Sequence, residues 1–317
     1  MSVPPVEPAP LTPPPDAGRP SGPRPRGTRR SARTRKSRAW QVALILATVA
    51  LTAVALVVIV PRLESKGPGP ESKGHPGAKA AQPGGAVPTG NLPGWRLTYY
   101  TDFSGNSLPD GWSAYSGQPG GDPYGYWNPD NVTVSNGALH LRTTADDDPK
   151  RPDTYSTGGV GFYGGTQKYG MYLIRMKGDY EPGLKISNIA LLWPADGSTW
   201  PPEIDFYEDG GGSRSSYTAS LHPGPDGDDC CIIRHSRENT GTQWHTYGVI
   251  WTPVSITYTI DGKPWAKVHQ SEVSSPGSWP ATPMTLDLQS QNLGPAQPSG
   301  PIETMTVAWV TEYAPNS

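Results

Sequence analysis

The chain has 317 residues and a formal net charge of -2, with 38 Gly, 38 Pro and 2 Cys. A near-neutral charge gives no reason to expect a nucleic-acid partner. The cysteines, Cys230 and Cys231, are adjacent, which excludes a scattered disulfide framework and a cysteine zinc signature. An unpaired state, a strained vicinal disulfide and an intermolecular bond all remain open for them.

The first 38 residues are rich in Pro and Arg and nearly free of apolar side chains. Such a segment cannot offset the entropy of ordering, so we expect a disordered tail. Residues 39–60 follow as an uncharged apolar run, AWQVALILATVALTAVALVVIV. As a helix this run would be about 30 Å long, the thickness of a bilayer core, and the basic flank predicts a cytoplasmic N-terminus. The alternative is a cleavable signal peptide, whose apolar region is usually only about 7–15 residues long.

Residues 61–94 are dominated by Gly, Pro and Lys and contain ESKG twice. This composition is typical of a linker, and a coil of this length spans on the order of 30 Å. We therefore predict a cell-membrane protein with one N-terminal transmembrane helix and an extracellular domain over residues 95–317.

Residues 95–317 contain no long stretch of helical periodicity. Short β-branched and aromatic runs alternate with turn residues, as in NVTVSNGALHLRT, YGMYLIRMKG, HTYGVIW and SITYTIDGKPW. The Asn-Gly and Asp-Gly pairs in these runs predict hairpin turns, because both residue types accept a positive φ. Many short strands at regular spacing indicate an all-β antiparallel sandwich.

The segment WPPEIDFYEDGG contains an E-x-D-x-x-E motif formed by Glu203, Asp205 and Glu208. Alternate residues of a strand share a face, so Glu203 and Asp205 point the same way. Tyr207 would come next on that face, unless a β-bulge puts Glu208 there instead. Three acids on one sheet face disfavour folding, whereas a glycosidase needs a pair of carboxyl groups there. A solvated acidic edge or a calcium site is the alternative interpretation.

At these residues the domain resembles the family-16 glycoside hydrolases, in particular their laminarinase-like, bulged branch. The resemblance extends over KYGMYLIRMK (168–177), NIALLWP (188–194), WPPEIDFYEDG (200–210), SLH (220–222), residues 243–265 and TVAWVTEY (306–313). It implies a concanavalin A-like β-jelly-roll with a substrate groove on its concave face.

Carried onto matching positions, the resemblance implies that Glu203 is the nucleophile, Glu208 the general acid/base and Asp205 the assisting carboxylate. It further implies that Trp193, Trp200 and His222 line the subsites nearest the cleavage point. Core or rim packing is the alternative role for each of these three. Two further residues, Trp127 and Gln289, are expected to reach the groove from neighbouring strands.

We expect no metal and no other cofactor. The six histidines lack metal-site spacing, and no Gly-rich loop has the context of a phosphate cradle. Many family members place an Asp of the closing strand at a structural calcium; the matching residue here is Ala308, which argues against that ion. The acid-rich residues 224–231 lack the spacing of a calcium loop.

The sequence thus predicts a retaining, endo-acting β-glycanase that hydrolyses O-glycosidic bonds of a polysaccharide such as β-1,3-glucan. One alternative is a cell-envelope transglycosylase that uses the same site. Another is a non-catalytic carbohydrate-binding domain, although such domains typically lose the catalytic carboxylates that are present here.

Overall fold

The computed structural model of the chain describes residues 83–119, 124–145, 155–180, 183, 185–197, 200–223, 233–273, 278–294 and 302–316. No helix within these ranges is long and apolar enough to cross a membrane. The tail, the apolar run at 39–60, most of the linker and Cys230 and Cys231 lie outside the described residues, so those predictions remain predictions.

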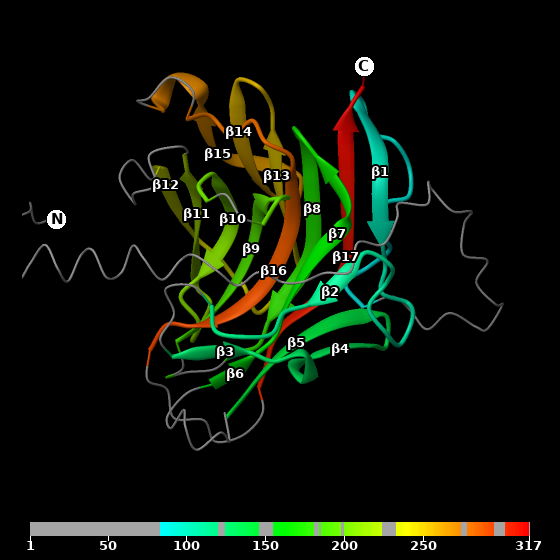
Figure 1. Ribbon diagram of the computed structural model, residues 1–317, viewed down its shortest axis with the longest axis vertical. Coiled ribbons are helices and arrows are strands. Elements are labelled where there is room, and N and C mark those ends of the chain that lie inside the picture. Colours follow the sequence, from blue (N-terminus) through cyan, green and yellow to red (C-terminus); the bar gives the residue numbers. More distant parts are fainter. Residues whose placement is uncertain are drawn as a thin grey trace, which may run out of the picture. The chain divides into compact units, whose positions relative to one another are not determined.

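The described domain consists of two β-sheets packed face to face, as the strand pattern predicts (Figure 1). One sheet has ten strands, here called the outer sheet: β1 (Trp95–Thr101), β3 (Gly125–Trp127), β4 (Val132–Ser135), β5 (Ala138–Ala145), β6 (Tyr155–Thr157), β8 (Gly170–Gly178), β13 (His245–Trp251), β14 (Ser255–Ile260), β15 (Lys263–His269) and β17 (Ile302–Pro315). The other has seven strands, here called the inner sheet: β2 (Trp112–Ala114), β7 (Gly159–Gln167), β9 (Ile186–Pro194), β10 (Glu203–Asp209), β11 (Ser216–His222), β12 (Ile233–Glu238) and β16 (Met284–Asn292).

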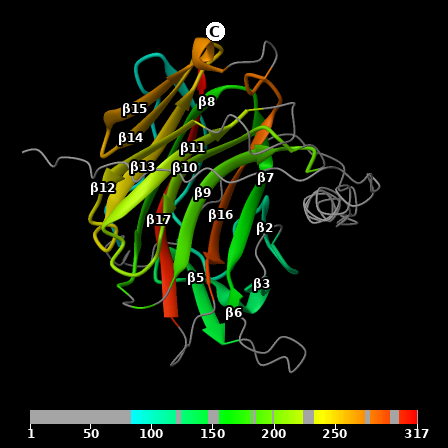
Figure 2. The same ribbon diagram turned by 90° about the vertical axis from the view of Figure 1, so that its left-hand side faces the viewer.

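The helical content of the described residues is confined to two short 3-10 turns, η1 (Pro129–Asn131) and η2 (Gln270–Glu272). The order of strands across the inner sheet is β12-β11-β10-β9-β16-β7-β2. The strand that carries the E-x-D-x-x-E motif therefore lies inside this sheet, between β11 and β9. Figure 2 shows the long strands of this sheet curving side by side.

Both predicted hairpin turns are confirmed. Asn136 and Gly137 join β4 to β5 with φ values of 52° and 73°, and Asp261 and Gly262 join β14 to β15 with 48° and 74°. Positive φ at both central residues is what a two-residue turn between twisted strands requires. The turn residues thus fix the register of these two strand pairs.

The core between the sheets is apolar and built from alternate strand positions. In β9, Ala190 and Leu192 belong to it; in β16, Met284, Leu286 and Leu288 do. The residues between them point to the other side of the inner sheet, because successive strand side chains alternate. We call that other side, turned away from the core, the open face.

The last residues of the predicted linker pack against the outer sheet. The Arg175 guanidinium on β8 donates from Nε to the Gly84 carbonyl at 2.9 Å, and its Nη1 lies 3.3 Å from Asp261 Oδ1. A Cβ on Gly84 would lie 3.0 Å from that of Ala308. The segment at Gly84 is therefore held against the outer sheet, on the opposite side of the domain from the open face.

Candidate active site

A β-bulge in β10 places the three acids of the motif on the open face. The register of β10 against β11 shifts between Asp205 and Glu208, and against β9 between Asp205 and Tyr207. Phe206 and Tyr207 are consecutive, yet both belong to the core. The extra residue returns Glu208 to the face of Glu203 and Asp205, so the bulged arrangement is the one that forms.

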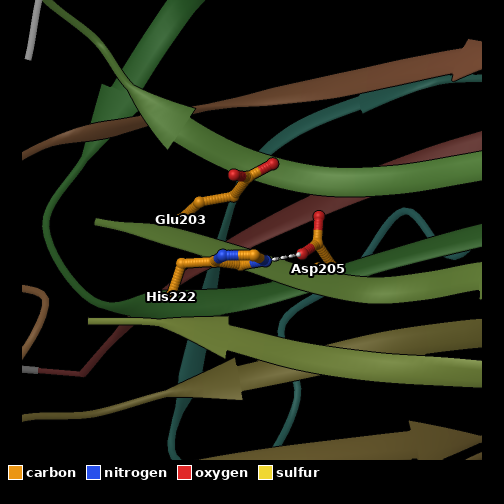
Figure 3. A group of neighbouring side chains, drawn as sticks. All are labelled: Glu203, Asp205 and His222. Carbon is orange, nitrogen blue, oxygen red and sulfur yellow. Dashed lines mark ion pairs between the residues drawn. The ribbon is translucent and has the colours of Figure 1, made fainter. Parts of the chain in front are cut away.

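The acids meet His222 from β11, which lies opposite Glu203 in the strand register. The His222 Nε2 lies 3.1 Å from Asp205 Oδ2. Figure 3 shows Glu203, Asp205 and His222 directed toward one another from two adjacent strands. Their donor atoms all lie within 4.8 Å, a spacing that would also suit a cation, so the expected absence of a metal stays a prediction.

Trp200 completes the cluster from the loop before β10. Its indole Nε1 donates to Glu203 Oε2 at 2.7 Å, and its ring centroid lies 6.0 Å from that of His222. The side chain is still 36% exposed. One edge of Trp200 therefore orients a carboxylate while its face remains accessible, the arrangement that a sugar-contacting tryptophan needs.

The other predicted residues lie on the strands beyond. Trp193 is partly exposed and pairs with Thr285 of β16, on the far side of Glu203 from His222. Gln289 pairs with Gly159, and a Cβ on Gly159 would lie 3.2 Å from Trp127 Nε1 and 3.3 Å from Gln289 Cβ. Trp127 and Gln289 thus gather with each other, separated from the acids by β9.

Burial raises the pKa of all three acids. The pKa of Glu203 lies well above its ordinary value, first through burial and then through the charge of Asp205. Burial and then the charge of Glu208 raise the pKa of Asp205 to about 8. Burial also raises that of Glu208, which the charge of Arg234 opposes. The cluster therefore holds protons near neutral pH, as a site that needs a proton donor requires.

Two charged residues that were not predicted lie in the same row across the open face. The register runs Arg234, Ser220, Asp205, Leu191, Asp287 and Gly161 from β12 to β7. Arg234 is exposed and its charge opposes the rise in the pKa of Asp205. Asp287 is buried, and burial and then the charge of Glu203 raise its pKa to about 7. The alternation in MTLDLQSQN places Asp287 on the face of Gln289, a signal that could have found it.

The end of β10 is anchored by a buried ion pair. Arg214 Nη1 lies 2.7 Å from both carboxylate oxygens of Asp209, which also accept hydrogen bonds from the Tyr207 hydroxyl and the Gly211 amide. Both side chains are at most 2% exposed. Since Asp209 follows Glu208 directly, this pair holds the acid strand at its C-terminal end.

Replacing Arg214 by Ala is expected to destabilise the domain by about 3 kcal/mol or more, because the Asp209 charge would stay buried without a partner. Denaturant unfolding of the variant beside the wild type measures this loss. The matched control is Arg96→Ala on the exposed side of β1, expected within about 0.5 kcal/mol of the wild type. Equal losses in both variants would contradict the anchoring role.

Comparison with known proteins defines the class of this protein. An all-β sandwich with clustered carboxyl groups on the open face of its inner sheet is the arrangement of a glycoside hydrolase. Residues 122–311 match the Glycosyl hydrolases family 16 profile. This match covers more than half of the chain, which therefore belongs to glycoside hydrolase family 16. The family and the β-sandwich predicted from sequence are both confirmed.

Individual relatives are similar over parts of their length. The endo-1,3-1,4-beta-glycanase ExsH of Rhizobium meliloti (strain 1021) is 28% identical over 148 residues, 45% of this chain and 31% of that protein. The chain thus spans about a third of that relative. The endo-beta-1,3-glucanase of Pyrococcus furiosus has a TM-score of 0.61 at 20% identity, covering 70% of this chain and 95% of that one. The catalytic domain of the Thermotoga petrophila RKU-1 laminarinase has a TM-score of 0.60, also at 20% identity, covering 70% and 99%. These structures establish the likeness of fold.

Proposed function

We propose that this protein is an endo-acting, retaining β-glycanase that hydrolyses a β-1,3-glucan or a related polysaccharide. One observation carries the proposal: the bulge in β10 brings Glu203, Asp205 and Glu208 to the open face, where burial raises the pKa of each. The names of the relatives, an endo-1,3-1,4-beta-glycanase and endo-1,3-glucanases, support a β-glucan substrate.

In the proposed mechanism Glu203 attacks the anomeric carbon while Glu208 protonates the leaving oxygen. Glu208 then removes a proton from water, which hydrolyses the glycosyl-enzyme and regenerates Glu203. The bond between Trp200 and Glu203 orients the nucleophile. Asp205 interacts electrostatically with both glutamates, so its protonation adjusts the charge that each of them feels.

We also propose that residues 39–60 anchor the domain in the cell membrane, with the N-terminus inside and the enzyme outside. The length and apolarity of that run and its basic flank support this topology. Gly84, in the described end of the linker, packs on the outer sheet, away from the acids of the inner sheet.

The test uses the full chain, purified in a mild detergent, on a panel of β-glucans, galactans and cell-wall preparations. New reducing ends are counted beside Glu203→Gln. Hydrolysis of one polymer that is lost in the variant is the expected result. Binding without hydrolysis would overturn the enzyme in favour of a binding domain. Longer products with an added acceptor would show transglycosylation instead.

Asp205→Asn is expected to lower kcat on the order of 10²-fold and to move the acidic limb of the kcat/KM profile to lower pH. The charge of Asp205 raises the pKa of Glu203, so without it Glu203 remains ionised at lower pH. The matched control is Asp261→Asn in the outer-sheet hairpin turn, which should leave the limb in place. A limb that does not move in Asp205→Asn would contradict the coupling.

A further inference from the structure

A second cluster lies on the open face, away from the acids. Tyr163 of β7 is 53% exposed, although it follows the core residue Phe162 directly. Its hydroxyl and Asp287 Oδ1 both lie 2.8 Å from where a Gly161 Cβ would be. Only a residue without a side chain leaves room there, so Gly161 lets the phenol end of Tyr163 lie against Asp287.

Tyr115 forms the other side of this cluster. Its ring packs against Trp127 with centroids 4.8 Å apart, and a Cβ on Gly159 would lie 2.6 Å from the Tyr115 ring. The Tyr115 hydroxyl and the Trp127 indole Nε1 are buried and have no hydrogen-bond partner of good geometry among the described residues. The Tyr115 hydroxyl nevertheless lies close to Asp287 and Tyr163, and burial together with these two residues raises its pKa, so it links them.

The distance between this cluster and the acids decides how long a substrate must be to reach it. Gly161 is three strands from Asp205 in one register row, which corresponds to about 14 Å at normal strand spacing. A polysaccharide that lies across the inner sheet with one bond at the acids would pass over Tyr163 several sugars away. A short oligosaccharide would end before it.

We propose that Tyr163 is the stacking platform of a distal sugar subsite and that Asp287 is the positioning residue that holds it. The proposal rests on the proposed function. The ring offers an exposed apolar face to a pyranose, while Asp287, Tyr115 and the two glycines fix its angle. Asp287 acts through Tyr163, because its own side chain is buried and lies near the Tyr163 hydroxyl.

The test compares Tyr163→Ala with the wild-type full chain on β-1,3-glucan oligosaccharides of increasing length. We expect KM for long oligosaccharides to rise on the order of tenfold, with kcat and the constants for the shortest substrate unchanged. Tyr163→Phe removes the hydroxyl of the ring, and Asp287→Asn removes the charged group beside it, while both keep the ring itself. Each should therefore raise KM for long substrates by a smaller factor. The matched control is Tyr100→Ala on β1, a tyrosine 49% exposed on the outer sheet.

Equal KM values for Tyr163→Ala and Tyr100→Ala on long substrates would overturn the subsite and leave the proposed function intact. Should the wild type hydrolyse none of these glucans, the proposed function fails. Calorimetric measurement of the binding of laminarin-type β-1,3-glucan then tests whether Tyr163 contacts the sugar. Weaker binding in Tyr163→Ala but not in Tyr100→Ala would support the platform. Equal binding, or none by the wild type, would overturn it.

Discussion

Replacing Glu203 by Gln is expected to lower kcat at least about 10³-fold on every substrate, because the amide cannot form the covalent glycosyl intermediate. The structure makes a second expectation for the same variant. Glu203 is partly buried beside Asp205, whose charge disfavours its ionised form, so the neutral amide should leave the melting temperature unchanged or raise it. Kinetics and thermal unfolding of one preparation measure both.

Glu208→Gln should separate the two roles. Without the acid, glycosides with poor leaving groups should be hydrolysed about 10²–10⁴-fold more slowly, whereas an aryl glycoside that leaves without protonation should keep most of its glycosylation rate. Glu203→Gln should lose activity on both substrates to the same extent. Glu272→Gln in η2 of the described domain is the control. The reverse pattern would exchange the roles of the two glutamates.

Replacing Glu312 by Gln is expected to stabilise the domain strongly at alkaline pH. Glu312 of β17 is 2% exposed, and its Oε1 has no hydrogen-bond partner among the described residues. In the strand register it lies between Tyr99 and Tyr172, two residues at the core. Burial alone raises its pKa from 4.5 to about 8, so ionising it in the folded state costs on the order of 5 kcal/mol.

The direction in which stability changes with pH follows from proton binding by Glu312. Between pH 4.5 and about 8 the folded state holds the Glu312 proton more tightly than the unfolded chain does, so wild-type stability falls as pH rises through this window. Glu312→Gln lacks this loss: its melting temperature should be close to that of the wild type near pH 4.5 and about 10 °C higher near pH 9. Asp205 and Asp287, whose pKa values are raised to about 8 and 7, leave a smaller slope of the same sign.

Thermal unfolding across pH 4.5 to 9 checks this expectation. The exposed Glu238 at the end of edge strand β12 provides the control, since Glu238→Gln removes the same charge from solvent and should leave the slope unchanged. Parallel curves for the wild type and Glu312→Gln would contradict a buried, proton-binding Glu312.

Local pattern was sufficient for the strands and for the chemistry of the motif. HTYGVIW and EIDFYE form β13 and β10, because β-branched and aromatic residues alternate there and turn residues bound them. Period-two alternation places Glu203 and Asp205 on one face without further information. Glu208 needed the bulge, which the sequence presents only as an alternative, since it depends on how Phe206 and Tyr207 both enter the core.

Only the tertiary structure decided the rest. The cluster of Tyr115, Tyr163 and Asp287 unites β7, β16 and the residue after β2, which are distant in the sequence. Glu312 alternates like any other residue of β17 until the second sheet covers it. Pairing of distant strands depends on the packing of the whole core, which local propensity does not encode. The sequence by itself therefore determined which residues carry the chemistry, and the packing of the two sheets determined their neighbours, their burial and their protonation.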